Sequence, residues 1–348
     1  MIAKRHVLLR ADASHAIGFG HVGRLYALYE ELVAHKLEPV LLFGDRQGPG
    51  EDADTGGLVG WLHDRGLDTT ISTWTKDRVL QALDHLHGHT VLVIDGRPLA
   101  EELAPSARTR THVKTIVIDD QGQFDVPVHA VVNHNFHAPA LASTYRATHR
   151  LLGRRYALLR KDIRRLTRGS CRPSTGGRLR VVVTFGGSDP VGATARLLRI
   201  LPSDRLLDLV VIEGPGFHPD DSVAAGVELA RAAGHTVEVR RAPRDPGALF
   251  ATADAAIASA GGTLGELAYL GCPAIAYAIV EDQIPGARAQ AEAGLIAGGR
   301  DWAITDDATL TAELQAFLGD AAWRSALREH ALATIDGDGP RRILTEAI

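Results

Sequence analysis

Short apolar runs alternate with stretches of helical periodicity along the whole chain, and this alternation limits the possible folds more than any single motif does. Five runs in the first half are expected to be strands, at residues 6–10, 39–43, 90–94, 115–118 and 130–133. Three stretches there carry apolar residues at helical spacing, at residues 22–35, 57–65 and 76–86. The pattern predicts an α/β fold in which helices cover both faces of a parallel sheet.

A second α/β block begins afresh at Leu179, and 348 residues are many for a single core. Its strands are expected at residues 180–185, 208–212, 236–239, 255–258 and 274–278. We therefore predict a Rossmann-like domain at 1–165, a linker at 166–177, a second Rossmann-like domain at 178–335 and a tail at 336–348. Two doubly wound domains predict an interdomain cleft, which is where ligands bind in such proteins.

The composition indicates a globular protein without a general attraction to nucleic acid or membranes. The chain has 45% hydrophobic and 23% charged residues, a net charge of −4 and no apolar run approaching about 18 residues. Its first residues enter a strand without an apolar signal segment, which favours a cytoplasmic protein. Cys171 and Cys272 are too few for a disulfide framework, and His134 with His137 lacks a third ligand, so we expect no metal and no cofactor. No sequence feature indicates an oligomeric state.

A glycine-rich segment, Ser14–Arg24, joins the first strand to the first helix. Gly18 and Gly20 allow backbone N–H groups to approach an anion, and the start of a helix adds partial positive charge. With Gly23 they also match the GxGxxG pattern of dinucleotide-binding proteins. However, seven residues separate the strand from the first glycine, and His21 occupies a position where a pyrophosphate favours a small residue. Dinucleotide binding is therefore the weaker interpretation of this segment.

Two later turns join a strand to a helix and offer backbone N–H groups to an anion, namely Gly186-Gly187-Ser188 and Gly261-Gly262-Thr263. Neither is a P-loop, because no Gly-Lys-Ser/Thr sequence follows. Glu266 lies one turn into the helix that follows the second of these turns. A carboxylate there suits ribose hydroxyls, and helix capping is the alternative interpretation.

The motifs together resemble a known family, the UDP-sugar hydrolases of pseudaminic acid biosynthesis. The resemblance rests on Arg10–Asp12, Ile17–Arg24 (IGFGHVGR), Leu151–Arg160 (LLGRRYALLR), Thr184–Pro190 (TFGGSDP) and Gly261–Glu266 (GGTLGE). It spans residues 10 to about 294 and implies the two-domain GT-B fold of many nucleotide-sugar glycosyltransferases.

The resemblance also implies roles for individual residues. The nucleotide would bind mainly to the second domain, with the Gly261–Thr263 turn at the diphosphate, Glu266 near the ribose, and UDP as the preferred nucleotide. His21 would face the sugar and act as the base. This agrees with the chemistry, because a glycosyl phosphate releases an already stable anion and one base for the incoming nucleophile suffices. The expected reaction is hydrolysis of a nucleotide-activated sugar, with water activated by His21.

Two segments depart from the family pattern on the sugar side. Asp95-Gly96-Arg97 stands where the family has Asp-x-Tyr, and Asp282-Gln283 stands where it has Asn-Gln. We assign Asp12, Arg97 and Gln283 to the sugar side and keep Asp282 as a second candidate for the base. The planar guanidinium of Arg97 suits a substrate carboxylate or phosphate, while an ion pair with Asp119 or Asp120 is an equal structural alternative.

Three other functions stay open on the sequence alone. A glycosyltransferase would use His21 to deprotonate a hydroxyl or amine acceptor. A non-catalytic protein would bind the nucleotide sugar without reaction, and an oxidoreductase would use the glycine loop for a dinucleotide.

Overall fold

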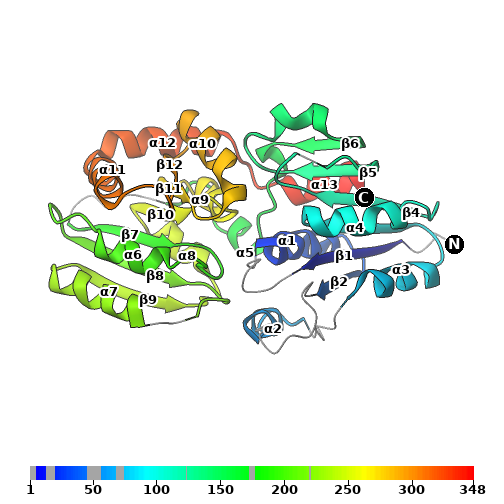
Figure 1. Cartoon of the computed structure of the whole chain (residues 1–348), viewed down its shortest axis with the longest axis horizontal. Helices are drawn as coiled ribbons and strands as arrows, with labels where there is room; N and C mark the ends of the chain where they lie inside the picture. The colour runs from blue at the N-terminus through cyan, green and yellow to red at the C-terminus, as the bar shows by residue number, and fades with distance from the viewer. Residues whose placement is uncertain are drawn as a thin grey trace. The chain divides into compact units, whose positions relative to one another are not determined.

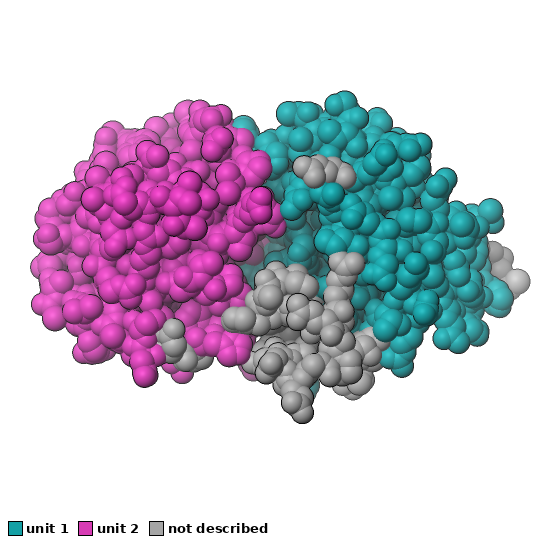
Figure 2. All heavy atoms as spheres, viewed as in Figure 1, with its two compact units in different colours: residues 1–161, 337–348 teal, residues 162–336 magenta. Residues whose placement is uncertain are grey.

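The computed structural model describes residues 5–12, 20–44, 56–67, 74–122, 124–171, 177–218 and 221–348. The chain forms two compact units (Figure 2). Unit 1 consists of residues 1–161 and 337–348, and unit 2 consists of residues 162–336. No helix in the described part of the chain combines the length and the apolar character needed to span a bilayer.

Unit 1 is a six-stranded parallel sheet with the strand order β2-β1-β3-β4-β5-β6. Helices lie against this sheet (Figure 1). In chain order its elements are β1 (His6–Asp12), α1 (Gly20–Ala34), β2 (Pro39–Gly44), α2 (Gly56–His63), α3 (Lys76–His85), β3 (Thr90–Asp95), α4 (Arg97–Ala107), β4 (Val113–Ile118), β5 (Val128–Asn133), η1 (Ala138–Thr144), β6 (Ala147–Leu152), η2 (Arg154–Tyr156) and α13 (Gly339–Ala347).

Unit 2 is a second six-stranded parallel sheet, with the strand order β12-β11-β10-β7-β8-β9. In chain order its elements are α5 (Lys161–Arg164, which begins at the unit boundary), β7 (Leu179–Thr184), α6 (Ala193–Arg199), β8 (Leu207–Glu213), α7 (Asp221–Ala232), β9 (Thr236–Arg241), α8 (Pro246–Ala251), β10 (Ala255–Ser259), α9 (Thr263–Leu270), β11 (Ala274–Ala278), η3 (Glu281–Gln283), α10 (Ile284–Glu292), β12 (Ala297–Asp301), α11 (Asp307–Gly319) and α12 (Ala321–Ala333). Both units are therefore doubly wound, as the alternating pattern predicts.

The central strands are buried because helices cover both faces of each sheet. β3 (TVLVID), β10 (AAIAS) and β11 (AIAYA) are buried along their whole length. Strands covered on both sides have continuous apolar sequences and not alternating ones. This explains why the apolar runs of the sequence locate these strands correctly.

The sequence pattern does not reveal β6, α4 and β12, each for a local reason. β6 (ATHRLL) is an edge strand with three exposed residues in its middle, so it contains no apolar run. α4 carries Pro98 and Pro105, which weaken its helical signal. β12 (AGGRD) is short and rich in glycine.

The end of the chain differs from the predicted tail at 336–348. These residues contain α13, which contacts α1 and η2 and belongs to unit 1 (Figure 1). Ile343 and Ala347 are buried in the core of unit 1, and the Tyr156 hydroxyl donates a hydrogen bond of 2.8 Å to Glu346. The sequence boundary failed here because a short amphipathic helix does not reveal which sheet it covers.

Candidate functional site

The strand order indicates one crevice in each unit. In a doubly wound sheet, ligands bind at the carboxyl ends of the two neighbouring strands from which the chain winds in opposite directions. In unit 1 these strands are β1 and β3, and in unit 2 they are β7 and β10. The residues that follow these strands are therefore the candidates for ligand binding.

In unit 1 this crevice holds a histidine and a carboxylate in direct contact. His21 is the second residue of α1, and Asp95 is the last residue of β3. The distance from His21 Nδ1 to Asp95 Oδ1 is 2.8 Å. The Asp95 side chain is completely buried, whereas 23% of the His21 side chain is exposed. The carboxylate is thus fixed inside the fold, and the imidazole keeps access to solvent.

Glycine at position 96 allows this approach. Gly96 has a φ of 109°, in the region that disfavours other residues. A Cβ built on it would lie 3.7 Å from Cε1 of His21, so the imidazole rests against the backbone of this residue. A side chain at position 96 would strain the backbone, whereas its Cβ would be in ordinary van der Waals contact with the ring.

Arg24 lies one turn after His21 on the same face of α1 and joins two carboxylates. Its Nε and Nη2 donate to the two oxygens of Asp95, at 3.0 and 2.7 Å. Its Nη1 lies 2.7 Å from both oxygens of Asp120. Burial lowers the pKa of Arg24, but the attraction of Asp120 and Asp95 outweighs burial and raises the pKa above its ordinary value. Arg24 is therefore permanently charged.

These contacts involve Nδ1 of His21 in both tautomers of the neutral ring. Asp95 Oδ1 accepts hydrogen bonds only, and it lies 2.8 Å from His21 Nδ1 and 2.7 Å from Arg24 Nη2. Arg24 Nη2 lies 2.7 Å from His21 Nδ1 and can only donate, so Nδ1 donates to Asp95 in one tautomer and accepts from Arg24 in the other. With the proton on Nδ1, Nε2 carries the lone pair and can accept a proton.

Asp120, His134 and Asn135 follow the next two strands, β4 and β5, and extend the cluster. Asn135 Nδ2 donates to Asp120 Oδ1 at 2.8 Å, and Arg24 Nη1 lies 3.3 Å from His134 Nε2. Burial, together with Arg24, lowers the pKa of His134 to about 4. His134 is consequently neutral at neutral pH and accepts from Arg24.

Most members of this cluster were not identified as site residues from the sequence. His21 was identified, but Asp95, Arg24 and Asp120 were not given a functional role. Two signals point to them: polar residues directly after buried parallel strands, and the i, i+3 spacing from His21 to Arg24.

The other residues predicted for unit 1 have contacts of their own. Asp12 is buried at the end of β1, where Arg10 Nη2 donates to its carboxylate at 2.5 Å. Arg97 forms an ion pair with Glu101 at 2.8 Å and contacts Gln121 at 3.3 Å. Gly20 is the first, exposed residue of α1, and Gly18 lies outside the described residues. Sugar-side roles for Asp12 and Arg97 stay predictions.

The two glycine turns of unit 2 differ in whether their helix is capped. The carboxylate of Asp189 accepts from the amides of Ala193 and Thr194, both at 2.8 Å, and so occupies the first turn of α6. The described residues provide no side-chain cap for α9, which Gly262 precedes. The amides of Leu264 and Gly265 donate to the carbonyls of Gly261 and Gly262, at 3.1 and 3.0 Å, and anion binding at this turn stays a prediction.

The turn after β7 is also packed tightly against its neighbour. A Cβ at Gly214 would lie 2.5 Å from the carbonyl oxygens of Gly186 and Gly187, and the amide of Gly216 donates to Gly187 at 2.9 Å. Ser188 is buried. These contacts give the Gly186–Ser188 turn a structural role, and its nucleotide-binding role stays a prediction.

Around the Gly261–Thr263 turn the structure places Gln283, which had been assigned to the sugar. Its Nε2 lies 3.5 Å from the position of a Cβ on Gly261, and its Oε1 accepts from the amide of Ile279 at 3.1 Å. Glu266 is half-buried in the first turn of α9, and Asp282 is exposed on η3. Gln283 is therefore a neighbour of the candidate anion site.

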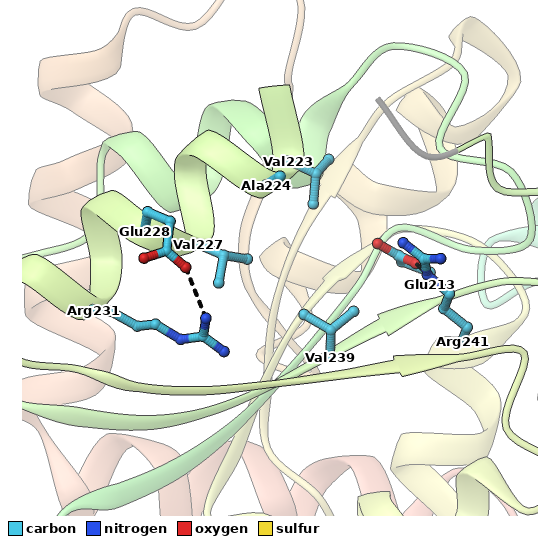
Figure 3. Close-up of a pocket in the computed structure, with 8 residues that line it drawn as sticks. All are labelled: Glu213, Val223, Ala224, Val227, Glu228, Arg231, Val239 and Arg241. Atoms are coloured by element: carbon cyan, nitrogen blue, oxygen red, sulfur yellow. Dashed lines mark hydrogen bonds and ion pairs between the residues drawn. The ribbon is translucent and has the colours of Figure 1, made fainter. Parts of the chain in front are cut away.

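A separate groove of about 550 Å³ lies between α7 and the edge strand β9 (Figure 3). Val223, Val227 and Val239 line it, with the ion pairs Glu228–Arg231 and Glu213–Arg241 at its sides. β9 is two strands away from β7, and the groove includes no residue predicted for the site. We do not assign it to the nucleotide.

Among the described residues, no three His, Cys, Asp or Glu side chains are grouped so that they could hold a metal ion. His134 contacts Arg24, and the pKa of His137 is lowered by burial, which Asp120 partly opposes. The two histidines are thus part of the cluster around Arg24.

Comparisons with known proteins bear on the fold. No protein-family model and no curated protein matches the sequence. Among solved structures, MurG from Acinetobacter baumannii is similar with a TM-score of 0.65 and 14% identity, over 99% of both chains. The glycosyltransferase SnogD from Streptomyces nogalater has a TM-score of 0.57 and 16% identity, over 99% of this chain and 100% of its own. The chain has the GT-B fold.

The GT-B fold is shared with an epimerase as well. UDP-GlcNAc 2-epimerase from Neisseria meningitidis, bound to UDP-GlcNAc, is similar with a TM-score of 0.61 and 11% identity, over 98% of both chains. The fold implied by the sequence resemblance is confirmed. These neighbours do not single out the sugar hydrolases within the fold.

Proposed function

We propose that this GT-B chain is an enzyme that transfers a sugar from a nucleotide donor, preferably a UDP-sugar, to a hydroxyl or amine acceptor. The observation that carries the proposal is the contact between His21 and the buried Asp95. With the proton on Nδ1, facing Asp95, Nε2 is the base. A histidine placed only for packing would not need a buried carboxylate on one nitrogen and solvent access on the other.

The proposed reaction needs only one base. His21 Nε2 removes the proton of the acceptor as the acceptor oxygen or nitrogen attacks the anomeric carbon. The bond from that carbon to the phosphate oxygen breaks, and the nucleoside diphosphate leaves with the electron pair. Asp95 stabilises the imidazolium that forms, as the carboxylate does in a catalytic triad. A single displacement of this kind inverts the anomeric configuration.

The nucleotide is assigned to unit 2. We assign the diphosphate to the Gly261–Thr263 turn, at the positive end of α9, and the ribose to Glu266 in the first turn of the same helix. Similar structures support a uridine nucleotide, since the Neisseria epimerase is bound to UDP-GlcNAc and MnaA of S. aureus was solved with UDP.

Transfer to an acceptor replaces hydrolysis as the main proposal. The sequence resemblance favours water as the nucleophile, whereas the similar proteins whose names state an activity include several glycosyltransferases. The His21–Asp95 pair activates water or an acceptor equally well.

The test is to incubate UDP-sugars with the enzyme in ¹⁸O-labelled water, with and without a mixture of hydroxyl and amine acceptors. Transfer predicts little nucleotide release until an acceptor is present, and a product without label on the sugar. Rapid release without acceptor, with label on the free sugar, would establish hydrolysis instead. If UDP stabilises the protein against thermal unfolding but no nucleotide is released from a UDP-sugar under any condition, the protein is a non-catalytic binder.

Substitution of Glu266 by glutamine is expected to weaken UDP binding at least tenfold. A hydrogen bond to a charged group contributes about 1.5 to 3 kcal/mol, and the proposal gives this carboxylate the ribose hydroxyls to accept from. Calorimetry with UDP measures the effect, and the exposed Glu292 on α10 provides the matched control, Glu292→Gln. If Glu266→Gln binds UDP with unchanged affinity, Glu266 has a helix-capping role instead. If NAD stabilises the protein against thermal unfolding as much as UDP does, the nucleotide assignment is wrong.

A further inference from the structure

Arg24 holds two carboxylates with one guanidinium group, although one carboxylate would satisfy its charge. Asp95 takes Nε and Nη2, and Asp120 takes Nη1. The Asp95 side chain is completely buried, and those of Arg24 and Asp120 are 12% and 23% exposed. In this low-dielectric setting the charges interact strongly with one another and with the imidazole of His21.

The number of charges around Arg24 decides how strongly the Asp95 carboxylate can stabilise a protonated His21. If Arg24 were paired with Asp95 alone, its positive charge would largely cancel the carboxylate that a protonated imidazole needs. Asp120 brings a second negative charge, so that Arg24 is compensated and the charge of Asp95 is left to stabilise the imidazolium. The charge of a protonated His21 also helps to lower the pKa of Asp120, although less than Arg24 does.

We propose that Asp120 is a positioning residue that acts through Arg24 to set the proton affinity and the Nδ1–H tautomer of His21. Its part in turnover rests on the proposed function. Its effect on the imidazole does not, and the experiment below keeps the two apart.

Asp120 is itself held in place by a chain of hydrogen bonds from β5. Asn135 Nδ2 donates to its carboxylate at 2.8 Å, and the backbone amide of Asn135 donates to Asn133 Oδ1 at 3.1 Å. Asn133 Nδ2 donates to the Tyr145 hydroxyl at 2.9 Å, and this hydroxyl donates to Asp119 at 2.6 Å. Asn133, Tyr145 and Asp119 are all buried. The network fixes the direction from which Asp120 approaches Arg24.

The charged and titratable groups around His21 and Arg24 are consistent with a role for Asp120 in compensating the charge of Arg24. Burial acts to raise the pKa of Asp120, but Arg24 holds it well below its ordinary range. Asp120 therefore stays ionised at neutral pH. His134, after β5, is neutral because its pKa is about 4, and Arg154 on η2 acts on His134 as a further cation. Asp95 and Asp120 are then the groups that favour a charged His21.

The test substitutes Asp120 with asparagine, which removes the charge and keeps the shape. We expect the midpoint of the His21 titration, followed by NMR of ¹⁵N-histidine-labelled protein, to fall by about one pH unit. The fraction of neutral His21 with its proton on Nδ1 should fall as well. The spectrum of His21→Asn identifies the signal, and Asp125→Asn, which alters an exposed carboxylate of unit 1, should leave the midpoint in place.

Two more variants separate a charge effect from a damaged fold. Asp120→Glu restores the charge and should return the midpoint toward that of the original protein. Asn135→Ala keeps the charge but removes its anchor, so the tautomer ratio should change more than the midpoint. An unchanged midpoint in folded Asp120→Asn would overturn the inference. A lowered midpoint in a protein that turns over no donor would uphold the inference and overturn the proposed function.

In an active enzyme the kinetics give an independent readout. The lower pH limit of kcat/KM in Asp120→Asn should move by the same amount as the NMR midpoint, with UDP affinity unchanged. A merely structural role would reduce activity at all pH values equally, and that result would also contradict the inference.

Discussion

Replacement of His21 by asparagine is expected to lower kcat by about 10²- to 10⁴-fold, which is the usual contribution of a positioned base. Asparagine keeps a polar group at the start of α1 but cannot accept a proton from the acceptor. UDP affinity should change by no more than a few-fold, because the amides at the start of α9 and Glu266 belong to unit 2. Steady-state kinetics with a UDP-sugar and calorimetry with UDP measure the two effects.

The matched control is His35→Asn, which changes an exposed histidine directly after the same helix. It should leave kcat and UDP affinity unaltered. If His21→Asn retains full turnover, the base lies elsewhere, and the exposed Asp282 on η3 becomes the next candidate.

Replacement of Asp95 by asparagine is expected to destabilise unit 1 by about 3 to 5 kcal/mol, the typical cost of removing one partner from a buried ion pair. The Asp95 side chain is completely buried and accepts from Arg24 and His21. An amide NH₂ at this position would face two donors, so the loss includes unsatisfied polar groups as well as charge. Turnover should fall too, because the imidazolium loses its counter-ion.

Urea unfolding combined with peptide-resolved hydrogen exchange measures the destabilisation in unit 1 separately, since a chain of two units need not unfold in one step. Asp84→Asn is the control, because it makes the same chemical change in the exposed ion pair of Asp84 with Arg110. Exposed ion pairs contribute little to stability, so the free energy of unfolding of Asp84→Asn should hardly change. Equal stability of the Asp95 and Asp84 variants would show that the charge of Asp95 is not needed by the fold.

The fold was predictable where burial leaves a continuous signal in the sequence. Central strands such as β3 and β10 are buried on both faces, so their apolar runs stand out. β6 was missed because an edge strand tolerates exposed polar residues, and α13 was taken for a tail because its partner is far away in sequence. Elements that bury only part of their surface depend on contacts that a local window does not contain.

The site divides in the same way between local and long-range information. The sequence by itself determined the two α/β blocks, the glycine turns, and His21 at the start of a helix, because each depends on neighbouring residues. Tertiary structure alone decided that Asp95, 74 residues further on, meets His21, and that Arg24 links Asp95 to Asp120. The physical reason is strand order: β1 lies between β2 and β3, which brings the ends of β1, β3 and β4 to one edge of the sheet. No local pattern encodes that order, because it results from how the whole set of apolar strands and helices packs.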